Sequence, residues 1–191
     1  MRFIEKSTIY LAGGCFWGVE AYFKKLQGVI DTDTGYANGE GTDTDYRRVK
    51  QTHHAETVRI VYDKNRLDLA EILLHYFRII NPISVNKQGN DVGEQYRTGI
   101  FYEDEKDLEI INSVVNYIQS KYDEKLTVLV GKVSTAVHFK GTNKNSQSIK
   151  NTDKLDLICS VEVTIKRKKK GHKLDENILK SHIWVRTCIQ S

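Results

Sequence analysis

The chain has few cysteines and no long hydrophobic run. Its three cysteines, Cys15, Cys159 and Cys188, are too few and too widely spaced for a disulfide framework. No stretch of about 18 consecutive apolar residues occurs, which argues against a membrane-spanning helix. The first residues also lack the apolar stretch of a secretory signal peptide. We therefore expect a protein of the reducing cytoplasm that has no membrane partner.

Tyrosine and net negative charge are absent from the last third of the chain. All ten tyrosines lie at or before Tyr122. Residues 131–191 hold 13 Lys and Arg against 5 Asp and Glu, a net charge of +8. The remaining 16 basic and 20 acidic residues give residues 1–130 a net charge of −4. This shift predicts a globular domain over 1–130, followed by a divergent basic segment over 131–191.

Little regular structure is expected in the basic segment. Residues 142–152 are polar and predict a loop or disordered chain, and residues 157–165 could form a strand. Residues 166–170, KRKKK, favour a solvated charge cluster over the more specific alternative of nucleic-acid contact. Because no aromatic residue interrupts this run, binding of single strands is disfavoured as well. We expect no nucleic-acid partner.

The most informative stretch is residues 12–18, with the sequence AGGCFWG. An apolar run precedes it and bulky residues follow at helical spacing, which predicts a strand, a glycine turn and a helix. Cys15 would then lie at the first helical turn, where backbone N–H groups and the helix dipole favour the nucleophilic thiolate. Phe16 and Trp17 place two rings beside that sulfur, as suits a small, partly apolar electrophile. The alternative is a buried cysteine among ordinary core residues.

Hydrophobic periodicity predicts strands that alternate with helices along the first 133 residues. The expected strands lie at 9–11, from 29 onward, at 53–62, at 98–102 and at 126–133; the expected helices lie at 16–26, 67–80 and 104–122. This alternation indicates the α/β class.

Glu56 is the second candidate catalytic residue. It follows His53 and His54 at the start of an expected strand. In an apolar pocket its pKa would rise and it could donate a proton, whereas a solvated strand-end carboxylate is the commoner alternative. The histidines suggest a metal site with Cys15, but adjacent strand side chains point to opposite faces, so we expect no metal.

Two polar segments complete the candidate site. Tyr36 lies where an expected strand leads into the polar loop 40–45, which is long enough to be functional. A half-buried turn tyrosine is the simpler interpretation of Tyr36 alone. Residues 86–97 form a second loop, in which side-chain amides are unusually dense for a simple connection.

Four motifs in these segments resemble the peptide methionine sulfoxide reductases of the A type. They are GCFWG at 14–18, GYANG at 35–39, HAE at 54–56 and QGNDVGEQYR at 88–97. The resemblance covers residues 8–130. Residues 49–54 are similar to members fused to a B-type reductase domain, although no such domain is evident here. The resemblance implies an α/β (α+β) two-layer sandwich with a mixed sheet and a ferredoxin-like core.

The resemblance also implies the chemistry. The Cys15 thiolate would attack the sulfur of methionine S-sulfoxide, free or in proteins, and would be left as a sulfenic acid. The other expected roles are the substrate methyl pocket for Phe16 and Trp17, proton donation for Glu56, a hydrogen bond to the sulfoxide oxygen for Tyr36, and substrate positioning for Asp91 and Tyr96. No metal or organic cofactor is implied.

Regeneration of Cys15 would need thioredoxin or another thiol reductant. Relatives often carry recycling cysteines near the C-terminus, but Cys159 and Cys188 stand in no recognised context. We therefore expect an external thiol to resolve the sulfenic acid. A further substrate-binding tyrosine of the family has no counterpart after Tyr122. The alternative function is accordingly that of a catalytically impaired homologue, which binds oxidised Met segments or an acidic partner.

Overall fold

A computed structural model describes residues 3–139, 160–161 and 185–186 of the chain. Contacts divide the chain into two units, residues 1–149 and 150–191. In the second unit, β9 (Ser160–Val161) pairs antiparallel with β10 (Val185–Arg186). Cys159, Cys188, the basic run 166–170, the segment 142–152 and the rest of the expected strand 157–165 lie outside the described residues.

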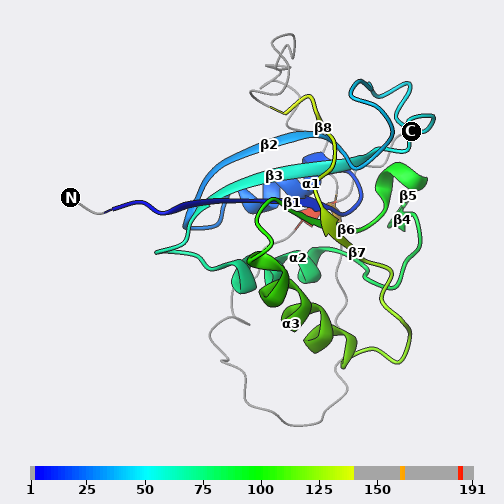
Figure 1. Cartoon of the computed structure of the whole chain (residues 1–191). Helices are drawn as coiled ribbons and strands as arrows, with labels where there is room; N and C mark the ends of the chain where they lie inside the picture. Colours follow the sequence, from blue (N-terminus) through cyan, green and yellow to red (C-terminus); the bar gives the residue numbers. More distant parts are fainter. Residues whose placement is uncertain (1–2, 140–159, 162–184, 187–191) are drawn as a thin grey trace. The chain divides into compact units, whose positions relative to one another are not determined.

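The first unit is built on a six-stranded mixed sheet (Figure 1). Its strands are β1 (Lys6–Ala12), β2 (Val29–Ala37), β3 (Ala55–Asp63), β6 (Gly99–Tyr102), β7 (Leu129–Lys132) and β8 (Ala136–Val137). The strand order is β7-β6-β1-β3-β2-β8. Only the β6–β7 pair is parallel within this sheet of described strands.

Three helices complete a two-layer sandwich: α1 (Phe16–Phe23), α2 (Leu69–Ile79) and α3 (Asp107–Gln119). Helix α1 packs on β2 and β3. Helices α2 and α3 pack against each other, and Figure 1 shows these two helices below the sheet. A 2.7 Å hydrogen bond joins the Tyr22 hydroxyl on α1 to His75 Nδ1 on α2. The chain order β1-α1-β2-β3-α2-β6 with the spatial order β6-β1-β3-β2 is a ferredoxin-like core. The predicted fold class is confirmed.

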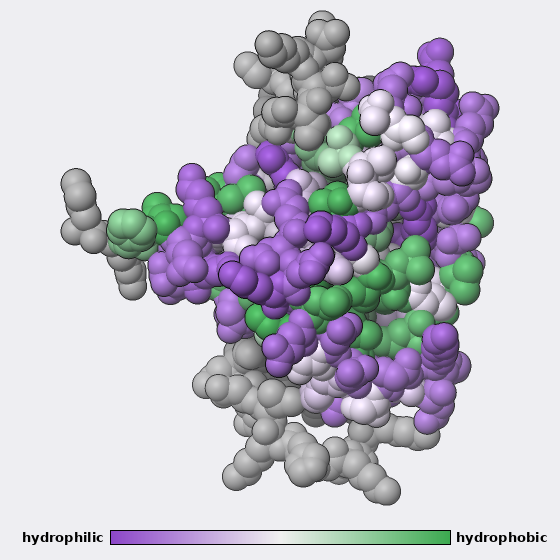
Figure 2. Space-filling view, viewed as in Figure 1, coloured by the Kyte–Doolittle hydropathy of each residue, from purple (hydrophilic) through white to green (hydrophobic). Residues whose placement is uncertain are grey.

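The central strand β1 is buried on both faces. Ile9 and Leu11 are inaccessible on one face, while Tyr10 and Ala12 join Phe101 in a cluster on the other. This continuous burial matches the uninterrupted apolar run that predicted the strand. The face shown in Figure 2 is mostly hydrophilic, with a hydrophobic area near β6 and β7. In the described part of the chain, no helix is both long and apolar enough to cross a membrane.

The helices are shorter than their hydrophobic spacing suggested. Helix α1 stops at Phe23 instead of Leu26, because the N–H groups of Lys25 and Leu26 donate to carbonyls three residues back. These tighter turns lead into Gly28, whose φ is +101°. Helix α2 begins after Asp68, because the Asp68 side chain accepts from the Glu71 N–H in a capping box.

Three local expectations differ from the structure. Strand β3 starts at Ala55 and not at His53, since His53 has a φ of +54°, which no strand accommodates. The expected loop 86–97 contains a short hairpin, β4 (Lys87–Gln88) and β5 (Asp91–Val92), and the 3₁₀ turn η1 (Glu94–Tyr96). Strand β8 was not expected. Because β7 and β8 both join the sheet, the sheet includes residues after position 130. The functional division of the chain at residue 130 stays a prediction.

Candidate active site

Cys15 occupies the N-cap position of α1, directly after the turn that ends β1. Its carbonyl oxygen accepts from the N–H groups of Gly18 and Val19, which begins the helix, and its side chain is partly exposed. The turn depends on glycine. A Cβ on Gly13 would lie 2.6 Å from Ile80 Cγ2, and Gly14 has a φ of +84°. The structure thus places a cysteine at the positive end of a helix, as the sequence predicted.

Glu56 lies next to this helix start and is only 2% exposed. Its Oε2 accepts a hydrogen bond from the Phe16 N–H at 3.2 Å. Burial raises the pKa of Glu56 to about 7; the Phe16 bond lowers it, and the charge of Asp91 raises it further. The solvated strand-end alternative is wrong, because this carboxyl is buried and can hold a proton near neutral pH.

Tyr36 stands directly opposite Glu56 across the β2–β3 pair. Opposed residues of neighbouring strands share a sheet face, so the two side chains belong to one site. Burial raises the pKa of Tyr36, and the charge of Glu56 raises it further. The hydroxyl therefore stays protonated and can donate a hydrogen bond at neutral pH.

Aromatic rings line the approach to these groups. The Phe16 ring centroid lies 5.7 Å from that of Tyr36 and 6.0 Å from that of Trp17. Phe16 packs on a cluster of Tyr36, Val49 and Val137, whereas Trp17 is 64% exposed. Phe16 is thus a fixed wall of the site, and Trp17 has room to cover a small apolar group.

Asp91 and Tyr96 reach the site from the hairpin and the 3₁₀ turn. Burial raises the pKa of Asp91, and a hydrogen bond with the Cys15 backbone opposes that rise. Burial and the charge of Glu56 raise the pKa of Tyr96, which also bonds to the Tyr46 side chain. The structure therefore brings both residues to the groups around Cys15 and Glu56.

The motif 88–97 also contains residues that hold this loop in place. The Gln88 amide forms two hydrogen bonds with the Asn81 backbone, at 2.7 and 2.9 Å. The Arg97 guanidinium donates to the carbonyl oxygens of Glu94 and Asn38, at 3.1 and 2.8 Å. The amides that stood out in the sequence thus serve the loop's architecture as well as the site.

The two histidines contact different partners. His53 pairs with Glu94 at 2.7 Å, and this partner raises the pKa of the imidazole. His54 is fully buried and its Nδ1 bonds to the Thr52 hydroxyl at 3.0 Å. Within residues 3–139, 160–161 and 185–186, no cluster of three His, Cys, Asp or Glu could hold a metal ion.

Sequence reasoning missed two residues at the edge of the site. Tyr46 bonds to Tyr96, and the His138 ring stacks edge-on against Tyr36 with centroids 5.9 Å apart. His138 Nε2 also contacts the Thr44 carbonyl oxygen. A tyrosine in a polar loop gave a weak signal for Tyr46. Nothing marked His138, because it lies beyond the last motif.

A cysteine at a helix start, a buried carboxyl with a raised pKa and aromatic walls are the groups that nucleophilic catalysis with proton donation requires. The sequence model of the family described as peptide methionine sulfoxide reductase matches residues 7–178. The chain therefore belongs to the peptide methionine sulfoxide reductase family. The match extends beyond residues 8–130, which carry the sequence motifs.

Solved structures agree with this family. Mxr1 from Saccharomyces cerevisiae in reduced form is 31% identical with a TM-score of 0.66, over 75% of this chain and 88% of Mxr1. Methionine sulfoxide reductase A of Corynebacterium diphtheriae is 28% identical with a TM-score of 0.60, over 67% of this chain and 65% of that chain. These likenesses and the family match support the A type, and reduction of methionine sulfoxide is the activity of the chain.

Proposed function

We propose that the chain reduces the S epimer of methionine sulfoxide, free or in proteins, with Cys15 as nucleophile and Glu56 as proton donor. The observation that carries this proposal is the Glu56 carboxyl, which is buried, bonds to the Phe16 N–H beside Cys15, and has a pKa of about 7. A carboxyl that keeps its proton near neutral pH can act as a general acid. Among the contacts of residues 3–139, none favours the alternative of a protein that only binds oxidised segments.

The reaction proceeds in two stages. The Cys15 thiolate attacks the sulfoxide sulfur while Glu56 gives a proton to the sulfoxide oxygen. The sulfur–oxygen bond of the substrate then breaks, the hydroxyl passes to the Cys15 sulfur and the bond between the two sulfurs breaks, so that methionine leaves and Cys15 becomes a sulfenic acid. A first thiol then displaces water from the sulfenic acid and forms a mixed disulfide. A second thiol breaks that disulfide and restores Cys15, so two thiols are oxidised for each sulfoxide reduced.

The remaining site residues bind the sulfoxide. Tyr36, protonated and opposite Glu56, donates a hydrogen bond to the sulfoxide oxygen. Phe16 forms the wall against the substrate methyl group, and exposed Trp17 covers it. Asp91 and Tyr96 position the rest of the methionine from β5 and η1. This arrangement fits a ligand with one apolar end and one strongly polar oxygen.

A direct assay tests the proposed reaction. With dithiothreitol as reductant, the S epimer of a methionine sulfoxide peptide should be consumed and the R epimer should remain, because one enzyme type handles one epimer. Separation of the epimers by chromatography during the reaction gives both rates. Binding of the S epimer without turnover would instead support the binding-protein alternative.

The reductant we propose is a thioredoxin in a reducing compartment such as the cytoplasm. A further structure of Saccharomyces cerevisiae Mxr1 is a complex with Trx2, and that chain shares this fold at 24% identity. Thiol–disulfide exchange requires access to the oxidised sulfur, and the Cys15 side chain is partly exposed. These features support direct attack by an external thiol on oxidised Cys15.

The double variant Cys159→Ser with Cys188→Ser should retain its turnover with dithiothreitol and with thioredoxin alike. The reason is that we expect an external thiol, and not an internal cysteine, to resolve the sulfenic acid. Paired assays of the wild type and the double variant with each reductant give the comparison. A selective loss of the thioredoxin-driven rate would show that one of these cysteines is the resolver.

A further inference from the structure

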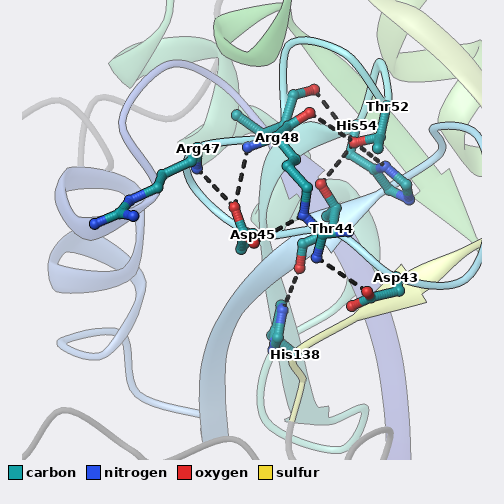
Figure 3. Close-up of polar contacts among 9 residues, drawn as sticks. Asp43, Thr44, Asp45, Arg47, Arg48, Thr52, His54 and His138 are labelled. Atoms are coloured by element: carbon teal, nitrogen blue, oxygen red, sulfur yellow. Dashed lines mark hydrogen bonds and ion pairs between the residues drawn. The ribbon is translucent and has the colours of Figure 1, made fainter.

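Residues 43–54 carry a network of polar contacts beside the active site (Figure 3). The Arg48 guanidinium pairs with Asp45 at 2.8 Å and with Asp43 at 2.9 Å. The other Asp45 carboxylate oxygen accepts from the backbone N–H groups of Arg47 and Arg48. The network fixes the turn and neutralises Arg48, while Figure 3 shows the Arg47 side chain extending away from these contacts.

Residues 43–54 also pack against residues of the candidate active site. Val49 is 1% exposed and packs with Tyr36 and Val137, the cluster on which Phe16 rests. Thr44, which is also buried, contacts His138 through its carbonyl oxygen. Thr44 and Val49 are thus buried, whereas Tyr46, Arg47 and Lys50 on the same segment are exposed to solvent.

An open hollow of about 440 Å³ lies between this turn and the loop that carries Asp91. Tyr46, Arg47 and Lys50 line one side, and Asp91, Val92 and Tyr96 line the other. Asp91 and Tyr96 are also the residues that we place against the substrate, so the hollow continues the active site. Tyr46 and Val92 are 66% and 64% exposed, which leaves apolar surface on both sides.

Arg47 and Lys50 bring uncompensated positive charge to this hollow. In the part of the chain that the structure describes, neither side chain takes part in an ion pair, in contrast to Arg48. Asp91 on the neighbouring loop is half-buried and its carboxyl bonds with the Cys15 backbone; among the described residues it forms no ion pair with either cation. Charges of one sign in a recess attract groups of the opposite sign.

We propose that this hollow is a subsite for the residue beside methionine sulfoxide in a protein or peptide, and that Arg47 and Lys50 make it select an acidic side chain. The inference rests on the proposed function, because the hollow acquires this role only when the sulfoxide lies between Cys15 and Asp91. The carboxylate of the neighbouring Asp or Glu meets the two cations, and its methylene groups lie along Tyr46 and Val92.

Peptides that differ in a single residue test this subsite. Methionine S-sulfoxide peptides carry Glu, Gln or Lys before or after the sulfoxide, and kcat/KM is measured for each with dithiothreitol at low and high salt. The Glu peptide should exceed the Gln peptide by roughly 2- to 10-fold, the scale of one or two exposed ion pairs. The Lys peptide should be the slowest, and added salt should reduce these differences.

Variants assign the selectivity to the two cations. In Arg47→Gln with Lys50→Gln the ratio of the Glu to the Gln peptide should fall to about 1, and in Arg47→Glu with Lys50→Glu the Lys peptide should become the best substrate. Lys125→Gln is the matched control. Lys125 is an exposed lysine in the segment between α3 and β7, and its removal should leave all ratios unchanged.

The outcomes separate this inference from the proposed function. Equal reduction of all wild-type peptides would overturn the subsite and leave the reductase activity in place. Failure to reduce any of them would contradict the proposed function itself. If the double glutamine variant lost only its thioredoxin-driven rate, with peptide ratios unchanged, the cations would face the reductant and the subsite assignment would be wrong.

Discussion

The Cys15→Ser variant is expected to convert methionine sulfoxide to methionine no faster than the background reaction. A serine hydroxyl is a far poorer nucleophile toward sulfur than a thiolate, and it cannot carry oxygen as a sulfenic acid. The loss should appear in steady-state turnover and also in a single turnover without reductant. In that single turnover the wild type forms one methionine per active site.

The serine variant should fold normally, which makes its inactivity interpretable. Cys15 is the N-cap of α1, and serine is among the preferred N-cap residues, because its hydroxyl accepts from a free N–H in the first turn. Thermal unfolding of the two proteins should therefore agree closely, and calorimetry should show that the variant still binds the sulfoxide. Retention of the wild-type rate by Cys15→Ser would remove Cys15 from the mechanism.

The parts of the site that depend on local sequence were predictable. Glycines, a cysteine and helical spacing suffice to place Cys15 at the start of α1, because a strand, a turn and a helix follow one another directly in the chain. Glu56 at the beginning of β3 was predictable for the same reason. Its burial was not, since burial depends on Phe16 and on distant residues that close the pocket.

The pairing of Tyr36 with Glu56 could not be read from the sequence. It depends on the β2–β3 register, and that register shifts at an irregularity between Val29 and Asp31. A shift by one residue would place Tyr36 on the opposite face of the sheet. The motifs therefore indicated that Tyr36 and Glu56 belong to the site, whereas the β2–β3 register brings their side chains to the same face of the sheet.

Short and distant elements escaped prediction for a different reason. The β4–β5 hairpin has two residues in each strand, too few for hydrophobic alternation to show. Strand β8 is equally short and pairs with β2 across about a hundred residues of sequence. Asp91 lies in the hairpin and His138 directly follows β8. Their contacts with the site could therefore be identified only from the structure.

Glu56→Gln should lower the rate of sulfoxide reduction by roughly 10²-fold, the scale expected for a lost general acid. The substitution keeps the shape of the side chain and leaves an oxygen to accept the Phe16 N–H, but it removes the proton that the sulfoxide oxygen needs. In the wild type, kcat/KM should fall as pH rises through about 7, where Glu56 loses that proton. The variant should lack this descending limb.

The free energy of unfolding of Glu56→Gln should also depend less on pH than that of the wild type. Because the pKa of Glu56 is raised from 4.5 to about 7 on folding, the folded state holds the proton more tightly than the unfolded state. That contribution is complete below pH 4.5 and is lost as pH rises to about 7, a change of about 3 kcal/mol in the free energy of unfolding. Urea unfolding at pH 5 and pH 8 should show this loss in the wild type and not in Glu56→Gln. A variant with wild-type turnover and an unchanged pH dependence of unfolding would return Glu56 to a structural role.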